Sequence, residues 1–245
     1  ITVKMHGTSG RTGNVLVTRE KNLNWFQRLN FKVIKFYNDL IGLKNPFKEI
    51  FNKENITETS YETITGSRRV AFLNVIEDGY HKGTGFREKI HESLKNRLHK
   101  GETLYYEIVG YQSPNSPLFH HNVKKDNIGK DIEKQYKKYL IGNIMEYSYN
   151  CNRELGEHQI WIYRITQTNE DGHQIDLNYS QRIARCQLLG LNHVPRLFWG
   201  NIDQFTLGGK RDLLESMNEL AEAPCSIFPK HISEGVVVEI EHPDI

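Results

Sequence analysis

The chain has 245 residues, of which 38% are apolar and 25% charged, and its net charge is +2 at pH 7. This length is sufficient to bury a core, and the composition is that of a soluble globular domain. The weak charge excludes a histone-like basic protein, and no apolar run approaches the roughly 18 residues of a membrane span. The cysteines Cys151, Cys186 and Cys225 lack C-x-x-C spacing and predict reduced thiols in a cytoplasmic protein.

The first half of the chain predicts strands separated by two amphipathic helices. Within GFREKIHESLKNRLHKG, Phe86, Ile90, Leu94 and Leu98 recur every four residues, and Gly101 follows as an expected C-terminal cap. TLYYEIVGY is β-branched and aromatic, which is typical of a buried strand. The predicted elements are a strand at 13–20, a helix at 24–41, a strand at 64–74, a helix at 85–101 and a strand at 103–111.

The second half begins with a segment of different character, about 112–150, which we interpret as an insertion. SPNSP marks a loop, and six lysines mixed with aromatic residues follow it. Because strands and helices mix without strict βαβ alternation, we expect a mixed α/β or α+β domain and not a doubly wound parallel sheet. The predicted elements are a helix near 130–141, a strand at 158–168, a turn at 169–172, helices at 180–190 and 209–222, and a strand at 232–241.

The stretch VKMHGTSGRTGN, residues 3–14, places Lys4 before a run of small residues. Gly7 and Gly10 would let the backbone approach a ligand, and the intervening hydroxyl and N–H groups can donate to phosphate oxygens. Arg11 adds a bidentate donor. Lys4 is then either a fixed cation on a phosphate, a nucleophile, or a surface lysine before a glycine turn. The Walker A pattern is excluded, because its glycines precede the lysine.

Four further positions each allow both a structural and a functional interpretation. Glu107 interrupts an apolar strand, so it either faces outward or binds a ribose hydroxyl or a metal ion. Glu234, followed by glycine and three valines, either opens a strand or serves a site. Arg68 is a solvated residue or a phosphate ligand, and Tyr163 belongs to the core or supports a base.

The order of these features along the chain resembles the covalent nucleotidyltransferases, the superfamily of ATP-dependent RNA and DNA ligases and mRNA-capping guanylyltransferases. K-M-H-G-T-S at 4–9 is similar to the first motif of the RNA ligases. Ser-Arg at 67–68, the strand with Glu107, the strand ending Tyr163-Arg164 and E-G-V-V-V at 234–238 follow in the order of that superfamily. The resemblance spans residues 4 to 238 and implies a single α+β nucleotidyltransferase (adenylation) domain over residues 1–245, with mostly antiparallel sheets flanked by helices.

The resemblance also implies a role for each matching residue. Lys4 would attack the α-phosphate of ATP and form lysyl-AMP, and Glu234 would help to hold Mg²⁺ or Mn²⁺. Glu107 would contact the ribose, and Tyr163 would stack on adenine. Arg164 stands where many relatives have an acidic residue, and Ser9 stands where many have asparagine. The residues placed against the nucleotide are Val3, Met5, His6, Gly7, Arg11, Arg68, Glu107 and Tyr163.

The function that the resemblance implies is ATP-dependent RNA ligation in RNA repair, joining RNA 5′-phosphate and 3′-hydroxyl ends. The alternatives are a guanylyltransferase, a DNA ligase or a non-catalytic nucleic-acid-binding relative. The last family motif, a pair of lysines, has no counterpart after Glu234. We therefore expect a fragment of a longer protein, or a chain that adenylates itself weakly. The basic stretches 21–35 and 124–138 are either phosphate-binding surfaces or solvated helix faces. The sequence predicts no membrane partner and leaves the oligomeric state open.

Overall fold

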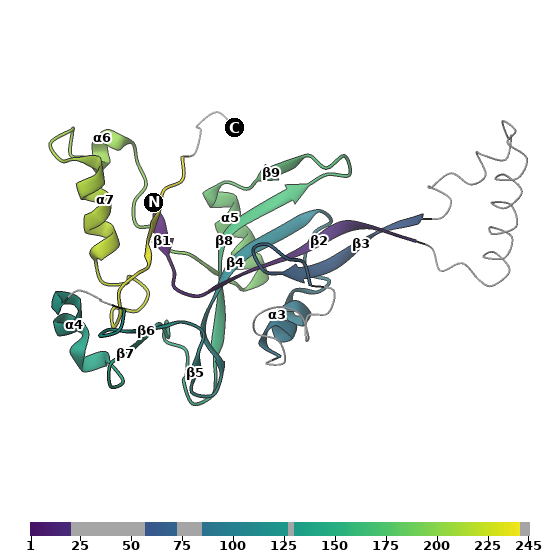
Figure 1. Ribbon diagram of the computed structural model, residues 1–245. Coiled ribbons are helices and arrows are strands. Elements are labelled where there is room, and N and C mark those ends of the chain that lie inside the picture. The colour runs from purple at the N-terminus through teal and green to yellow at the C-terminus, as the bar shows by residue number, and fades with distance from the viewer. Residues whose placement is uncertain (21–56, 73–84, 127–129, 241–245) are drawn as a thin grey trace, which may run out of the picture.

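The computed structural model describes residues 1–20, 57–72, 85–126 and 130–240 (Figure 1). The structure is a mixed α+β fold in which most strand pairs are antiparallel, as predicted, and its described helices are few. The strands are β1 Thr2–Lys4, β2 Thr8–Glu20, β3 Thr57–Gly66, β4 Glu102–Ser113, β5 Ser116–Pro117, β6 His120–Asn122, β7 Ile144–Glu146, β8 His158–Thr168, β9 Gln174–Asp176, β10 Asn192–His193 and β11 Gly235–Val237. The helices are α3 Phe86–Leu94, α4 Lys130–Tyr136, the 3₁₀ turn η2 Lys137–Tyr139, α5 Tyr179–Leu189, α6 Ile202–Phe205 and α7 Leu213–Glu222.

The main sheet has the strand order β10-β8-β4-β2-β3, with β5 added to β4 and β9 added to β8. All of its pairs are antiparallel except β10 with β8. Two small antiparallel pairs, β1 with β11 and β6 with β7, lie outside this sheet. The β1–β11 pair joins the two ends of the described chain, so residues far apart in sequence meet there (Figure 1).

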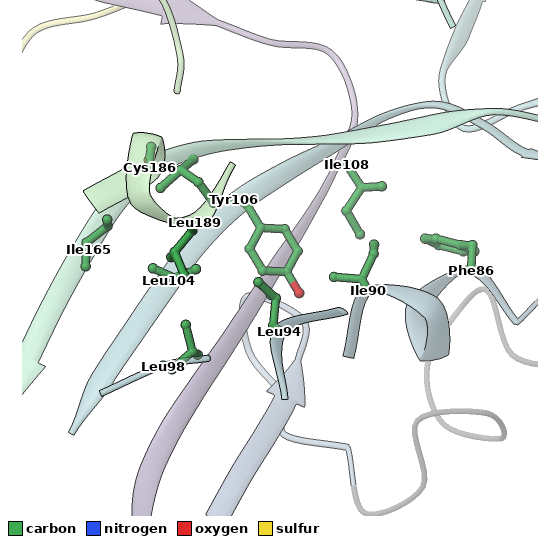
Figure 2. Close-up of a cluster of buried hydrophobic side chains, with 11 residues drawn as sticks. Phe86, Ile90, Leu94, Leu98, Leu104, Tyr106, Ile108, Ile165, Cys186 and Leu189 are labelled. Atoms are coloured by element: carbon green, nitrogen blue, oxygen red, sulfur yellow. The ribbon is translucent and has the colours of Figure 1, made fainter. Parts of the chain in front are cut away.

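One face of the main sheet is covered by α3 and α5 and forms a core of mainly aliphatic side chains, which we call the aliphatic core (Figure 2). Tyr106 lies at its centre, and its hydroxyl is bonded to Thr12, which is bonded to Thr65. Each of these three buried hydroxyl groups therefore has a hydrogen-bond partner. Its buried members are Phe86, Ile90, Leu94, Leu98, Leu104, Tyr106, Ile108, Ile162, Ile165, Cys186 and Leu189.

A second cluster, which we call the aromatic core, packs beside β1 and against the opposite face of β4. Neighbouring residues of β4 point to opposite faces, so Ile108 belongs to the aliphatic core and Val109 to the aromatic core. The 112–150 segment, predicted as an insertion, supplies half of this cluster. The buried members are Val3, Met5, Val109, Val123, Tyr136, Met145, Tyr147, Tyr149, Val194 and Cys225.

Several predicted elements have the bounds that the sequence suggests. The strand at 158–168 is β8, and the turn after it leads into β9. The helix at 180–190 is α5, which begins at a capping box between Asn178 and Gln181 and ends at Gly190 in the left-handed conformation. The helix near 130–141 is α4 followed by η2, and the strand at 103–111 is β4.

Other predictions were wrong in their bounds. The strand predicted at 64–74 is β3, which begins earlier and ends at Gly66, because Ser67 and Val70 close a turn there. The helix predicted at 85–101 ends at Leu94, since Asn96 adopts a left-handed backbone conformation with φ of 61°. The strand predicted at 232–241 is reduced to β11, and α7 begins only at Leu213, after the cap residue Asp212. The helix predicted at 24–41 lies outside the described residues.

A β-bulge interrupts the pairing of β8 with β4. Tyr105 pairs with Arg164 and Tyr106 pairs with Ile162, so Tyr163 is an extra residue without a partner on β4. The bulge allows Ile162 and Ile165, three residues apart, both to enter the aliphatic core.

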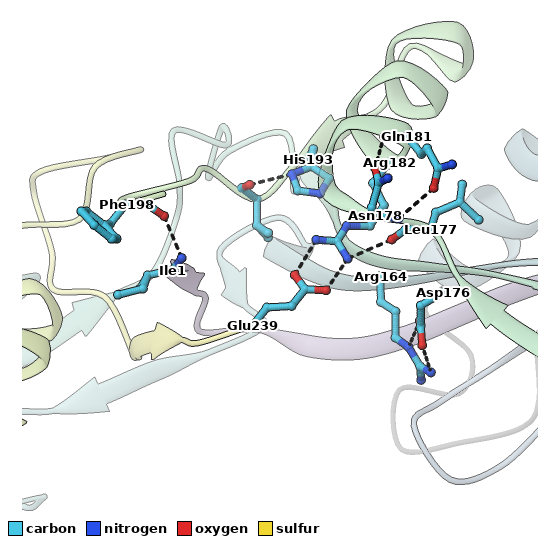
Figure 3. A network of polar contacts seen from close by, with 11 residues as sticks. Ile1, Arg164, Asp176, Leu177, Asn178, Gln181, Arg182, His193, Phe198 and Glu239 are labelled. Atoms are coloured by element: carbon cyan, nitrogen blue, oxygen red, sulfur yellow. Dashed lines mark hydrogen bonds and ion pairs between the residues drawn. The ribbon is translucent and has the colours of Figure 1, made fainter. Parts of the chain in front are cut away.

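Two ion pairs attach α5 to the rest of the domain. Arg185 holds the buried carboxylate of Glu102 with two hydrogen bonds of 2.7 Å. Arg182, which is 1% exposed, holds Glu239 with two hydrogen bonds of 2.6 Å (Figure 3). Both pairs have the bidentate geometry that favours arginine over lysine.

The cysteines are free and buried, as expected for reduced thiols. None of the helices in the described part of the chain is long and apolar enough to cross a membrane.

Candidate active site

The site is built around an ion pair between Lys4 and Glu234. The β1–β11 pairing places Lys4 opposite Gly235, and the Glu234 N–H donates to the Lys4 carbonyl at 3.1 Å. The Lys4 Nζ then lies 2.8 Å from the Glu234 Oε1, with the two side chains 51% and 36% exposed. The first and last predicted site residues are therefore brought into contact.

Glu107 lies beside this pair on the face of β4 that turns away from the aliphatic core. Its partner on β2 is Ser9, whose hydroxyl donates to the Glu107 Oε2 at 2.9 Å. Burial raises the pKa of Glu107 to about 7, the Ser9 hydrogen bond lowers it, the Glu234 charge raises it, and the Lys4 charge lowers it. Both members of the ion pair are therefore close enough to Glu107 to shift its pKa.

Tyr163, the bulge residue of β8, reaches the same place. Burial raises its pKa, as does the nearby carboxylate of Glu107, whereas the Ser9 hydroxyl and the Arg68 charge lower it. Arg68 itself is exposed, in the turn after β3. Glu107 and Tyr163 thus lie on the face that carries Ser9, and Arg68 is close enough to influence Tyr163.

His6 follows Lys4 by two residues, packs against the aromatic core and is 6% exposed. Its ring stacks on Phe119 at 5.1 Å between centroids and lies 3.8 Å from the Tyr147 ring. The pKa of His6 is lowered to about 3, mainly by burial and to a smaller extent by the charges of His121, His231 and Lys4. The imidazole is therefore neutral at physiological pH, and it packs as a ring that supports β1.

Gly7 and Gly10 of the motif are needed for close packing against β4, apart from any role in ligand binding. A Cβ on Gly10 would lie 2.3 Å from the Tyr106 Cε2, and a Cβ on Gly7 would lie 2.4 Å from the Ile108 carbonyl oxygen and 2.9 Å from the Glu107 Cγ. Hence β2 can lie this close to β4 only because both positions lack a side chain. The close approach that we expected toward a ligand is, at Gly10, an approach to a buried tyrosine.

Val3, Met5 and Arg11, which were also predicted for the site, are placed differently from Lys4, Glu107 and Tyr163. Val3 and Met5 are buried in the aromatic core, at 2% and 4% exposure, so their side chains face away from Lys4. Arg11 is half-buried on β2, opposite Tyr105, two residues beyond Ser9 and on the same face of the sheet.

Arg164, which stands where the resemblance leads one to expect an acid, is held by Asp176. Its Nε and Nη2 donate to the two carboxylate oxygens at 2.6 and 3.0 Å (Figure 3). Its guanidinium also lies 5.0 Å from the Tyr105 ring centroid. The bulge turns Arg164 to this face, and Asp176 on β9 neutralises it.

Arg87, the second residue of α3, was not among the residues predicted for the site. It is 5% exposed, and its Nη2 donates to the Thr8 hydroxyl at 3.3 Å. Burial lowers its pKa, while Tyr106 and Glu107 raise it. Helical periodicity alone places Arg87 beside an apolar stripe, and only the fold brings it to the motif.

The carboxylates suit one divalent cation but do not enclose it. Among the described residues, no three His, Cys, Asp or Glu side chains group as a complete metal site. Glu107 and Glu234 are two neighbouring carboxylates, and proteins hold Mg²⁺ through one or two carboxylates together with substrate phosphates. The donor set therefore fits a metal ion that arrives with a nucleotide.

No family model, curated protein or solved structure matches this chain.

Proposed function

We propose that this protein is an ATP-dependent RNA ligase of the nucleotidyltransferase type. The observation that carries the proposal is the convergence of Lys4, Glu107, Tyr163 and Glu234 from four separate strands or their ends. An amine, two carboxylates and an aromatic ring are the groups that nucleotidyl transfer through a lysine requires. The nucleotidyltransferase fold is part of the same proposal.

The first step forms a bond between the Lys4 Nζ and the α-phosphorus of ATP. The bond from that phosphorus to the bridging oxygen breaks, and pyrophosphate leaves. An ammonium has no lone pair, and the Lys4 Nζ is held in an ion pair with Glu234 at 2.8 Å. We therefore infer that Glu234 must release Lys4, and that the proton goes to solvent, before attack occurs. Engagement of Glu234 by Mg²⁺, which offsets triphosphate charge, is compatible with that release.

The other residues position the nucleotide. With a pKa of about 7, the Glu107 carboxyl is protonated in part of the molecules at neutral pH, so it can donate to or accept from a ribose hydroxyl. Tyr163 offers a ring for adenine, and Arg68 offers a cation for a phosphate. The AMP then passes to an RNA 5′-phosphate, and a 3′-hydroxyl displaces it to form the phosphodiester bond.

The test is covalent labelling of the protein with ATP labelled at the α-phosphorus, in the presence of Mg²⁺. We expect label on the wild type and none on Lys4→Arg, because a guanidinium is not a nucleophile at this pH. Lys95→Arg is the matched control, since Lys95 is 48% exposed and pairs with Glu92 at 3.3 Å. Labelled GTP and NAD separate a guanylyltransferase and an NAD-dependent ligase from the proposed enzyme. Mapping of the adenylate to a residue other than Lys4 would refute the mechanism.

A non-catalytic RNA-binding protein is the second candidate, and one observation favours it. Six exposed lysines on and around α4 and η2 make no ion pair with the described part of the chain: Lys124, Lys125, Lys130, Lys134, Lys137 and Lys138. Such a surface binds phosphates without any chemistry at Lys4. This candidate predicts RNA binding by Lys4→Arg at the wild-type affinity and no covalent nucleotide on either protein.

A further inference from the structure

A cavity of about 740 Å³ lies next to the candidate active site but does not include it. Its walls come from the start of β1, the segment after β10, α6, α7 and the residues after β11. None of its lining residues is Lys4, Glu107, Tyr163 or Glu234. The cavity is therefore separate from the residues proposed to react with ATP, and its chemistry has to be derived from its own residues.

The cavity wall includes two aromatic rings, those of Tyr179 and Trp199, close to the guanidinium of Arg196. Trp199 is 73% exposed, which is unusual for the largest apolar side chain on a soluble domain. The Arg196 Cζ lies 3.3 Å from the Tyr179 ring centroid and 5.9 Å from the Trp199 ring centroid. Arg196 thus lies against one ring with a second ring beside it, an arrangement that suits another flat, electron-rich group.

The polar groups of the cavity are mostly donors. Asn201 and Gln204 use their side-chain oxygens to cap α6, which leaves their NH₂ groups for a ligand. Glu239 is neutralised by Arg182 (Figure 3). Arg196 forms no ion pair with any described residue, so the described walls of the cavity carry a net positive charge. A ligand with a flat ring, acceptor atoms and negative charge matches these walls, and a nucleotide has all three.

β1 runs from the cavity to the Lys4 site. Thr2 lines the cavity and precedes Lys4 by two residues, so both lie on one face of the strand, about 7 Å apart along it. On β11, Glu234 lies at one end, and Val238 and Glu239, which line the cavity, follow the other end. A strand of RNA whose end lies at Lys4 can therefore extend over this face into the cavity.

We propose that the cavity binds a nucleobase of the RNA strand, stacked on Trp199, with a backbone phosphate close to Arg196. The identity of the ligand as the substrate strand rests on the proposed function. Any base can stack on an aromatic side chain, so the cavity would bind the strand without sequence specificity. The cavity would act on strand binding and joining, and not on the reaction of Lys4 with ATP.

The experiment compares RNA binding by three variants with the wild type, using a short fluorescein-labelled single-stranded RNA and fluorescence anisotropy. Trp199→Ala is expected to weaken binding about tenfold or more, and Trp199→Phe is expected to restore most of the affinity. Leu188→Ala is the matched control, because Leu188 is 78% exposed on α5 and does not line the cavity. RNA carrying 5-iodouridine should crosslink on irradiation to Trp199 or Tyr179, identified by mass spectrometry.

Two outcomes overturn the proposal. One is wild-type RNA affinity in Trp199→Ala together with no crosslink in the cavity. The other is a change in the sedimentation of Trp199→Ala without a change in RNA affinity, which would make the cavity a contact between copies of the chain. Covalent labelling by ATP is measured in parallel. If the wild type takes no label but Trp199→Ala still loses RNA affinity, the proposed function fails and the cavity proposal stands.

Discussion

The aliphatic core and the aromatic core lie on opposite faces of β4, and they differ in whether their buried polar atoms have hydrogen-bond partners. In the aliphatic core the central hydroxyl, that of Tyr106, has its hydrogen-bond partner, and the remaining members are mostly hydrocarbon. The aromatic core buries the Tyr136 hydroxyl without a hydrogen-bond partner in the described structure, and the Nε2 of His231, whose ring packs against Tyr149, also lacks one. Unpaired buried polar atoms cost stability, so they persist where something other than packing maintains them. The candidate active site lies on the aromatic core.

This contrast predicts that the aliphatic core determines stability and the aromatic core determines activity. Leu94 is fully buried between α3 and the sheet. Leu94→Ala should lower the free energy of unfolding by about 4 kcal/mol, because it removes methyl groups and leaves a cavity. Urea denaturation measures the loss, with Leu188→Ala as a surface control expected to change stability by less than about 0.5 kcal/mol. Labelling by ATP, per folded molecule, should stay at the wild-type level; a loss of labelling would break the contrast.

Gly10 tests the point where the motif meets the aliphatic core. Gly10→Ala places a methyl group 2.3 Å from a Tyr106 ring that is fully buried and cannot move aside. We expect a loss of about 3 kcal/mol in the free energy of unfolding, measured by thermal or urea denaturation. A loss below about 1 kcal/mol would mean that β2 and β4 can separate, and that Gly10 serves a ligand instead.

Tyr149 tests the aromatic core with a change that preserves shape. The His6 backbone N–H donates to the Tyr149 hydroxyl at 2.7 Å, and both groups are buried. Tyr149→Phe leaves that N–H without an acceptor, which should cost about 2 kcal/mol of stability. Because His6 is two residues from Lys4, we also expect slower labelling by ATP. Tyr139→Phe, at a residue 39% exposed, is the control and should change neither quantity.

The smallest effect is a change in the pH dependence of stability on replacing Glu107. The folded protein holds a proton on Glu107 up to about pH 7, whereas the unfolded chain loses it near 4.5. Between these values the folded state binds more protons, so this group makes stability fall as pH rises through the window. Glu107→Gln should remove on the order of 1 kcal/mol of that fall, after allowance for partial exposure. Urea denaturation at several pH values measures it, and an unchanged or steeper fall would contradict it.

The sequence predicted best those elements whose ends are set by local chemistry. The capping box at Asn178 and the left-handed Gly190 define α5 without reference to the rest of the chain. It predicted least well the elements whose ends depend on single residues in unusual conformations. Asn96 ends α3 although the apolar stripe continues, and Leu98 still packs in the aliphatic core after the helix has ended.

The site could be predicted as a list of residues but not as an arrangement. Lys4 and Glu234 are recognised separately by their motifs, and their contact depends on pairing between β1 and β11. Ser9 and Glu107 are 98 residues apart, and only the register of β2 on β4 places them in contact. Arg87 was missed because no local pattern distinguishes a helical arginine that turns inward from one that faces solvent.

Tyr163, the extra residue of β8, contributes to one face of the main sheet and is not needed by the other. If Tyr163 were deleted, β8 would pair with β4 in unbroken register, and Ile162 and Ile165 would still enter the aliphatic core. The hydrocarbon side of the strand is therefore complete without this tyrosine. Its presence costs the strand a paired backbone unit and adds one aromatic ring, and that ring stands on the side of Lys4.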